Sequence, residues 1–251
     1  MMLRKETFPW FIHRHANLLT DSGRDLPQAL SICMSISQMF VLRTPETRHY
    51  LWETIKRENQ RLFNQKDQMH AFEISASLQA QVIYLVMSLI DSSPESEEAC
   101  LELMESLNSL YISAKKMLAG PMTPSELSSR SMSWKGWILA ESQRRMTNLW
   151  FLIGTVICIK TGMMCDDSPS YKPIPLPALK SLWEASSESA WGFEYEATRN
   201  IQTSGLETFG DLMEAQKYRF LPSNAQRLDK WNAGVDNLGV LLTLASTIIR
   251  S

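Results

Sequence analysis

Cysteine and glycine are both scarce in this sequence, and each shortage limits the folds that it can adopt. The 251 residues include only 4 Cys, namely Cys33, Cys100, Cys158 and Cys165, without a Cys-x-x-Cys spacing. That pattern argues against a zinc ribbon and against a disulfide framework, and it indicates reduced thiols in a nuclear or cytoplasmic protein. The 10 Gly stand against 14 Met and abundant Leu and Ala, a balance that favours helices over sheets.

An excess of positive charge is also missing. The chain has 25 Lys and Arg against 27 Asp and Glu, which gives a formal net charge of −2. A protein that binds DNA on its own normally carries a basic face, because neutralising the phosphates supplies most of the affinity. We therefore expect no direct binding to nucleic acid.

Long apolar runs are missing as well. The longest, "LWFLIGTVICI" at residues 149–159, is short, whereas crossing a bilayer takes about 20 residues. The first residues also lack the apolar run and small-residue cleavage site of a signal peptide. We expect no membrane partner.

The familiar motifs of catalysis and cofactor binding do not occur. The sequence contains no G-x-S-x-G, no P-loop and no G-x-G-x-x-G, so motif evidence for hydrolase, NTPase or dinucleotide chemistry is missing. His13 and His15 would point apart in a strand, with no third ligand near them in sequence. "CDDSP", residues 165–169, is similar to the start of the Asp-rich magnesium motif of terpene synthases, but a proline run follows and a second motif is missing. We expect no metal and no cofactor.

Apolar residues recur every three or four positions through much of the chain, a spacing typical of amphipathic helices. They do so in residues 26–42, in residues 67–90 and from Leu228 to Ile249. Thr44 and Pro45 are a typical N-cap and first residue for the helix between the first two segments. The almost wholly apolar second half of residues 67–90 predicts a central helix, and the terminal segment predicts one well-buried helix.

Three stretches interrupt this spacing, and we expect loops there, near residues 91–98, 119–133 and 166–177. No strand alternation persists, and no Asn-Gly or Asp-Gly hairpin turn occurs. The prediction is an all-α protein, a single helical domain of about eight to ten packed helices over residues 1–251.

"WKGWILAESQRRM", residues 134–146, places charged residues among aromatic ones. Trp134, Trp137, Glu141 and Arg145 lie on one helix face, and Arg144 lies at its edge. Burying either charge alone would be costly, but Glu141 and Arg145, four residues apart, can neutralise and hydrogen-bond each other. We interpret the five residues as a buried polar staple that fixes one helix packing. A catalytic carboxylate or a ligand-binding arginine is the alternative.

A second group of acids lies in "SESAWGFEYE". Glu188, Glu194 and Glu196 occur close together there, beside Trp191 and Tyr195. A pair of carboxylates suits acid–base chemistry. We favour a solvated helix face.

The polar staple segment also carries a family resemblance. "WKGWILAESQRR" resembles the W-x-x-W-(I/L)-x-x-E-S-x-R-R-T signature in the regulatory regions of fungal zinc binuclear-cluster transcription factors, with Met146 in place of the usual threonine. Four other pieces match in order: "FPWFIHRH", "ASLQAQVIYLVMSLID", "PIPLPALKSLWEASSESAWGFEY" and "LDKWNAGVDNLGVLLTLA". The resemblance runs over nearly the entire chain and implies an all-helical regulatory domain, which usually lies after an N-terminal DNA-binding cluster.

The chain departs from the family at that DNA-binding cluster. The cluster needs six cysteines, beginning Cys-x-x-Cys, in a basic N-terminal segment, whereas this sequence has 4 scattered ones. The resemblance therefore implies either a relative without its own DNA-binding domain or a fragment of a longer product.

Two main functions are compatible with these features. The first is a transcription-factor-like regulatory protein that acts through a partner, such as a DNA-binding regulator or a second copy, or through a small apolar molecule. The alternative is a cofactor-independent enzyme of fungal secondary metabolism, an isomerase, cyclase or pericyclase, with an apolar pocket in the same scaffold. Glu141 and Arg145 would then be the first catalytic candidates. A decayed paralogue without selected activity is a third possibility.

Overall fold

The structure, a computed structural model, describes residues 8–20, 23–91, 93–117, 120–128, 131–161, 171–200 and 205–249. Within them it contains eleven α-helices, one short 3-10 helix and no strand beyond an isolated bridge between Pro175 and Thr208. The all-α class is therefore confirmed. Two very short helices, α5 and α7, bring the number above the eight to ten expected.

The helices form two compact units, Met1–Gly120 and Pro121–Ser251. The boundary between the units falls in the stretch near residues 119–133 that the sequence marks as a loop. Each unit has its own buried apolar core. One domain over residues 1–251 stays a prediction.

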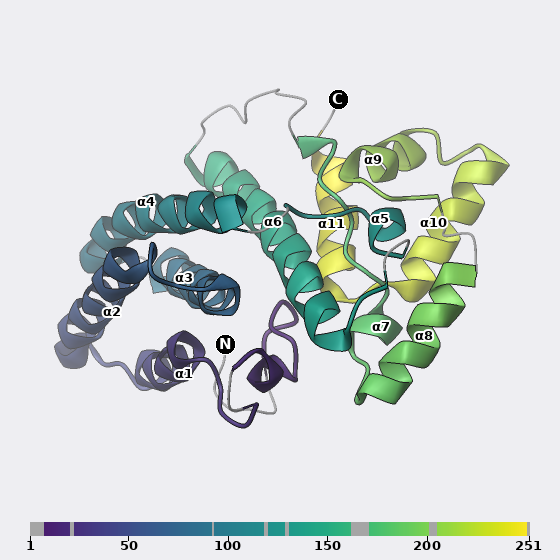
Figure 1. The fold of residues 1–251 in the computed structure, drawn as a ribbon. Coiled ribbons are helices and arrows are strands. Elements are labelled where there is room, and N and C mark those ends of the chain that lie inside the picture. The colour runs from purple at the N-terminus through teal and green to yellow at the C-terminus, as the bar shows by residue number, and fades with distance from the viewer. Residues whose placement is uncertain are drawn as a thin grey trace. The chain divides into compact units, whose positions relative to one another are not determined.

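The first unit is built around α3 (Ala71–Asp91). The other elements of this unit are η1 (Ala16–Leu19), α1 (Gln28–Val41), α2 (Pro45–Gln65) and α4 (Pro94–Met117). Helix α3 packs against α1, α2 and α4 (Figure 1). It is buried almost continuously from Ile74 to Ser88, which confirms the central helix expected from its apolar sequence. Among the described residues α3 is also the one helix long and apolar enough to cross a membrane, but 78% of its most apolar stretch is buried within the protein.

The end of α3 joins the ends of its neighbours through Asp91. Its carboxylate accepts hydrogen bonds from Arg43 Nε at 2.6 Å, from Trp52 Nε1 at 3.0 Å and from Ser93 Oγ at 2.8 Å. Burial opposes ionisation, but the hydrogen bonds from Ser93, Arg43 and Trp52 outweigh it and lower the pKa of Asp91. Asp91 therefore links the segment after α1, helix α2 and the start of α4 as an anion.

The second unit contains the other seven α-helices: α5 (Pro124–Ser128), α6 (Trp134–Thr161), α7 (Lys180–Trp183), α8 (Glu188–Asn200), α9 (Phe209–Lys217), α10 (Pro222–Gly234) and α11 (Asn237–Ile248). Helix α6 is the longest, with 28 residues. It packs against α8 and α11, while α11 also contacts α9 (Figure 1).

The prediction of one terminal helix from Leu228 to Ile249 is wrong, because the chain breaks between α10 and α11. Val235 and Asp236 are extended, and the Asp236 carboxylate caps α11 by accepting hydrogen bonds from the backbone N–H groups of Leu238 and Gly239, at 3.0 and 3.4 Å. An N-cap of this kind satisfies amides that have no partner within the helix. The three- and four-residue apolar spacing continues across the break and hides it.

Two of the three expected loops are shorter than predicted. Near residues 91–98, α3 runs to Asp91 and α4 begins at Pro94, a residue that suits a first helical turn. Helix α5 lies within the expected 119–133 loop. Residues 171–177 contain no α-helix, as expected, whereas residues 166–170 and Cys165 lie outside the described residues.

Candidate functional site

Helix α6 carries three charged side chains that are fully enclosed in the second unit. Glu141 and Arg145 are 0% exposed and Arg144 is 1% exposed. Glu141 Oε1 accepts a hydrogen bond from Arg145 Nε at 2.9 Å, and Glu141 Oε2 lies 3.3 Å from Arg144 Nε. One carboxylate thus contacts two arginines from its own helix.

The second carboxylate of the cluster comes from the N-cap of α11. Asp236 Oδ2 accepts a hydrogen bond from Arg145 Nη1 at 2.5 Å, while Oδ1 caps the helix. We call Glu141, Arg144, Arg145 and Asp236 the buried ion cluster. Its two negative and two positive charges balance, which is the condition under which charges are tolerated away from water.

The cluster also binds the backbone of the proline-rich segment before α7. Arg144 Nη1 donates to the Leu176 carbonyl at 3.2 Å, and the Ala178 N–H donates to Glu141 Oε1 at 2.9 Å. Asn148 Nδ2 donates to the Pro175 carbonyl at 2.8 Å. Closely spaced prolines prevent a helical hydrogen-bond ladder, so buried backbone groups there need other partners. Side chains of α6 supply them.

A chain of aromatic rings begins at the guanidinium of Arg145. Its Cζ lies 4.1 Å from the centre of the Trp183 ring, a cation–π distance. The ring centre of Trp137 lies 6.3 Å from that of Trp183 and 5.9 Å from that of Trp191, and Trp191 stacks on Tyr195 at 4.7 Å. The rings limit the access of water, which strengthens the electrostatic interactions inside.

Burial lowers the pKa of Arg144, and the attraction of Glu141 opposes that shift. Arginine remains protonated at neutral pH because its ordinary pKa is above 12. Glu141 Oε1 already accepts hydrogen bonds from Arg145 and Ala178. A general base needs to reach a substrate proton. Glu141 and Arg145, however, line neither the cavity beside α1 nor the cavity beside α9.

Of the five residues singled out in the sequence, the structure joins Glu141, Arg144 and Arg145 directly. Trp137 packs against the rings beside them, and Trp134 is buried one turn earlier on α6. Sequence reasoning missed Asp236, Asn148 and Trp183 as members of this site. Two arginines with one acid on a buried face were a signal that a second carboxylate was needed.

The remaining sequence candidates do not form a second site in the described residues. Glu188 and Glu196 are exposed and Glu194 is half-buried, as expected for a solvated face of α8. His13 is buried, and its Nδ1 accepts a hydrogen bond from the His15 N–H at 3.1 Å. No group of three or more His, Cys, Asp or Glu suited to a metal ion occurs in the part of the chain that the structure describes.

Two cavities lined by described residues lie away from the buried ion cluster. One lies in the first unit, between the start of α1 and the turn from α2 to α3, and has a volume of about 410 Å³. The other lies in the second unit beside α9, is lined by Lys172, Asp211 and Tyr218 among others, and has a volume of about 680 Å³.

The chain is similar to a fungal transcription factor over most of its length. A curated relative, the transcription factor gsfR2 of Penicillium aethiopicum, is 26% identical over 202 residues. The match covers 76% of this chain and 47% of the relative, so the chain spans about half the length of the relative that it matches. No family model matches the chain. No solved structure matches it significantly.

Proposed function

We propose that this protein is a regulatory protein of the fungal transcription factor type, which acts in the nucleus or cytoplasm through a protein partner. The observation that carries the proposal is the similarity to a fungal transcription factor over 76% of the chain. The proposed partner is a DNA-binding regulator of the same kind, with a helical regulatory domain.

The buried ion cluster supports this proposal because it joins the sequence pieces that carry the resemblance. Glu141 and Arg145 belong to the signature on α6, Ala178 to the proline-rich piece and Asp236 to the closing piece. We assign the cluster a structural role: it fixes how α6, the proline-rich segment and α11 pack. The two carboxylates form ion pairs with the two guanidinium groups, as expected of a packing device.

The outward face of α11 supports a protein partner. Helix α11 contains no charged residue, and Val240, Leu241, Leu244 and Ile248 are 40 to 62% exposed. Exposed apolar patches on folded proteins often mark protein interaction sites. An apolar helix face of a second regulatory domain is the occupant that such an uncharged stripe suits, as in helix-to-helix association.

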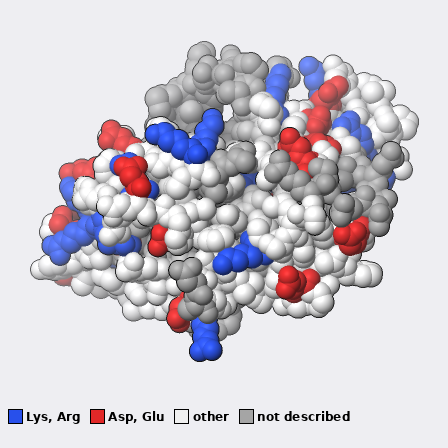
Figure 2. All heavy atoms as spheres, in the orientation of Figure 1, with Lys and Arg blue, Asp and Glu red and all other residues white. Residues whose placement is uncertain are grey.

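The surface charges support an indirect connection to DNA. Over α2 and α4, Lys and Arg lie beside Asp and Glu (Figure 2), and Lys56 lies 3.2 Å from Glu102 and 3.8 Å from Glu98. A helix surface of mixed sign lacks the continuous basic face that phosphate binding needs.

The alternative function, a cofactor-independent enzyme, has less support. Its candidate residues Glu141 and Arg145 are wholly enclosed, and they line neither of the two cavities described above. Catalysis at the cluster would require a substrate to displace both the ion pairs and the surrounding rings.

The test is direct binding between the purified chain and the regulatory domains of zinc-cluster factors from the same organism, measured by biolayer interferometry. Leu244→Glu should weaken a specific interaction at least about tenfold, because a charge would be buried at the contact. Leu101→Glu is the matched control, since Leu101 is 68% exposed on α4 in the other unit. If none of the factors binds, or if both variants behave alike, the proposal is wrong. Self-association measured by light scattering would identify a second copy as the partner instead.

A further inference from the structure

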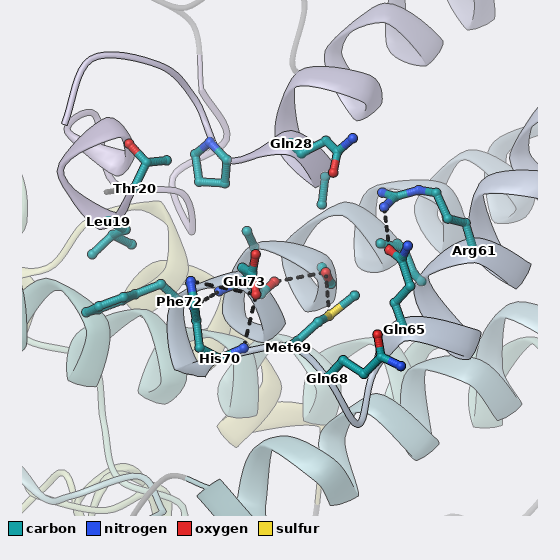
Figure 3. Close-up of a pocket in the computed structure, with 15 residues that line it drawn as sticks. Leu19, Thr20, Gln28, Arg61, Gln65, Gln68, Met69, His70, Phe72 and Glu73 are labelled. Carbon is teal, nitrogen blue, oxygen red and sulfur yellow. Dashed lines mark hydrogen bonds and ion pairs between the residues drawn. The ribbon is translucent and has the colours of Figure 1, made fainter. Parts of the chain in front are cut away.

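The cavity of the first unit is built by two separate stretches of the chain. Residues from η1 to the start of α1 form one side, and residues from the end of α2 to the first turns of α3 form the other (Figure 3). Its volume of about 410 Å³ lies in the usual range for small-molecule sites, about 300–1,000 Å³. All of its described lining residues belong to the first unit.

The lining is apolar where the cavity meets the core. Leu62 and Ala76 are buried at 0 and 2% exposure, and Leu19 and Ala29 are buried beside them. Met69 and Phe72 are half-buried in the same wall. A thioether and an aromatic ring adapt well to flat apolar ligands.

Side-chain amides line the opening. Gln28 comes from the α1 side, whereas Gln65 and Gln68 come from the opposite side (Figure 3). Gln65 Oε1 accepts a hydrogen bond from Arg61 at 2.7 Å. The side chains of Gln28 and Gln68 have no hydrogen-bond partner among the described residues. Each free amide offers both donors and an acceptor to a ligand.

The charged side chains at the cavity already have partners in the protein. Arg61 makes two hydrogen bonds to the Glu58 carboxylate, at 2.7 and 2.6 Å. Glu73 accepts a hydrogen bond from the backbone N–H of His70 at 3.0 Å, and its carboxylate lies 3.7 Å from His70 Nε2. A ligand of either sign would meet one like charge as well as one opposite charge, since both Arg61 and Glu73 line the cavity. The lining therefore favours a neutral molecule.

We infer that this cavity binds a small, uncharged, planar molecule that carries hydroxyl or carbonyl oxygens. Its flat apolar part lies against Leu62, Ala76 and Phe72, and its oxygens face the amides of Gln28 and Gln68. That such binding regulates the protein rests on the proposed function, whereas the binding itself does not.

Three naphthalene probes that share one ring system and carry substituents of different charge test the ligand class: neutral 2-naphthol, anionic 2-naphthoate and cationic 2-naphthylmethylammonium. Calorimetric titration of the whole chain at pH 7 should show one 2-naphthol per chain, bound at least about tenfold more tightly than either charged probe. Undetectable or unsaturable 2-naphthol binding, or an equal or stronger affinity for a charged probe, would overturn the inference.

Two variants test the location. Gln68→Trp places a bulky ring at the opening on an exposed position, and it should weaken 2-naphthol binding at least about tenfold. Gln60→Trp is the matched control, because Gln60 is exposed on α2 outside the cavity, and it should change the affinity less than about twofold. Ala76→Phe, which fills the cavity from inside, is a second variant that should weaken 2-naphthol binding. Circular dichroism checks that this variant is folded.

Equal affinities of the wild type and Gln68→Trp would overturn the location. The regulator-binding assay is run on the same preparations. A chain that binds 2-naphthol as expected but no regulator disproves the proposed function alone. A chain that binds a regulator but not 2-naphthol disproves this inference alone.

Discussion

At the residue scale, the stability of the buried ion cluster depends on a balance between the cost of desolvating its charges and the gain from pairing them. Moving a charge out of water costs several kcal/mol per ion, and the attraction between partners offsets this only with good geometry and further hydrogen bonds. Glu141 has both, because it contacts Arg144 and Arg145 and also accepts the Ala178 N–H. Loss of one carboxylate therefore leaves a buried positive charge without its partner.

Glu141→Gln should lower the free energy of unfolding by about 3–5 kcal/mol, because the variant keeps the shape but removes the charge between two arginines. Urea denaturation followed by circular dichroism measures the change. Glu184→Gln is the control, because Glu184 lies 3.9 Å from Lys180 in an exposed pair that should contribute less than about 1 kcal/mol. Similar losses for the two variants would contradict the role assigned to the cluster.

The sequence pointed to three of the four residues of this cluster. Glu141 and Arg145 are one helical turn apart, so periodicity alone brings them together. Asp236 follows Arg145 by 91 residues, and helical spacing carries no information about contacts between distant elements. The imbalance of two arginines against one acid on this helix face was the only local sign that a second carboxylate takes part.

Cys33 is a second residue whose chemistry depends on burial. The side chain is fully buried between α1 and α3, and burial raises the pKa of its thiol from 9.0 to about 12. Burial also raises the pKa of the neighbouring Tyr84. Both groups are neutral when protonated, so the folded state favours the protonated forms.

We expect iodoacetamide at pH 8 to leave Cys33 unlabelled in the native protein and to label it in urea, because the thiolate is the reactive form. Cys100 and Cys158 are half-buried and serve as internal controls. The stabilisation from Cys33 is complete below pH 9 and is lost as pH rises towards about 12. Peptide mass spectrometry reads the labelling, and native labelling of Cys33 as fast as of Cys100 would contradict the prediction.

At the element scale, the break between α10 and α11 depends on one glycine. A Cβ at Gly239 would lie 2.5 Å from Val235 Cβ and 3.2 Å from Trp231 Cζ2. Only a residue without a side chain allows α11 to begin so close to the end of α10. The sequence predicted helix on both sides, but the apolar period continues across the break, and the cap of Asp236 was not recognised as a start signal.

Gly239→Ala should lower the free energy of unfolding by about 1–3 kcal/mol through overpacking, although alanine is the better helix former. Gly192→Ala on α8 is the matched control, because nothing lies within 4 Å of its added Cβ. That variant should raise stability by about 0.5–1 kcal/mol through helix propensity. Thermal unfolding of both variants gives the comparison, and an equal gain in the two would show that α10 and α11 do not pack this closely.

At the scale of the whole molecule, the sequence predicted the all-α class because the apolar period near 3.6 persists through long segments. It also marked the 119–133 stretch in which one unit ends and the next begins. It did not predict two units, since periodicity describes each helix separately and does not say which helices share a core. In the described residues each unit has its own polar centre, Asp91 in the first and the buried ion cluster in the second.

These two centres allow the units to be perturbed one at a time in the full chain. Asp91→Asn removes the anion that accepts hydrogen bonds from Arg43, Trp52 and Ser93, at a cost of about 2 kcal/mol. Asp236→Asn removes the second carboxylate of the buried ion cluster, at a cost of about 3 kcal/mol or more. If the units unfold independently, each variant speeds amide hydrogen exchange at least about tenfold in its own unit only. Hydrogen-exchange mass spectrometry of both variants and of the wild type measures the exchange rates in both units in one experiment.

Equal acceleration in both units would mean that residues 1–251 unfold as one cooperative domain, as the sequence predicts. The division into two units would then have no energetic counterpart.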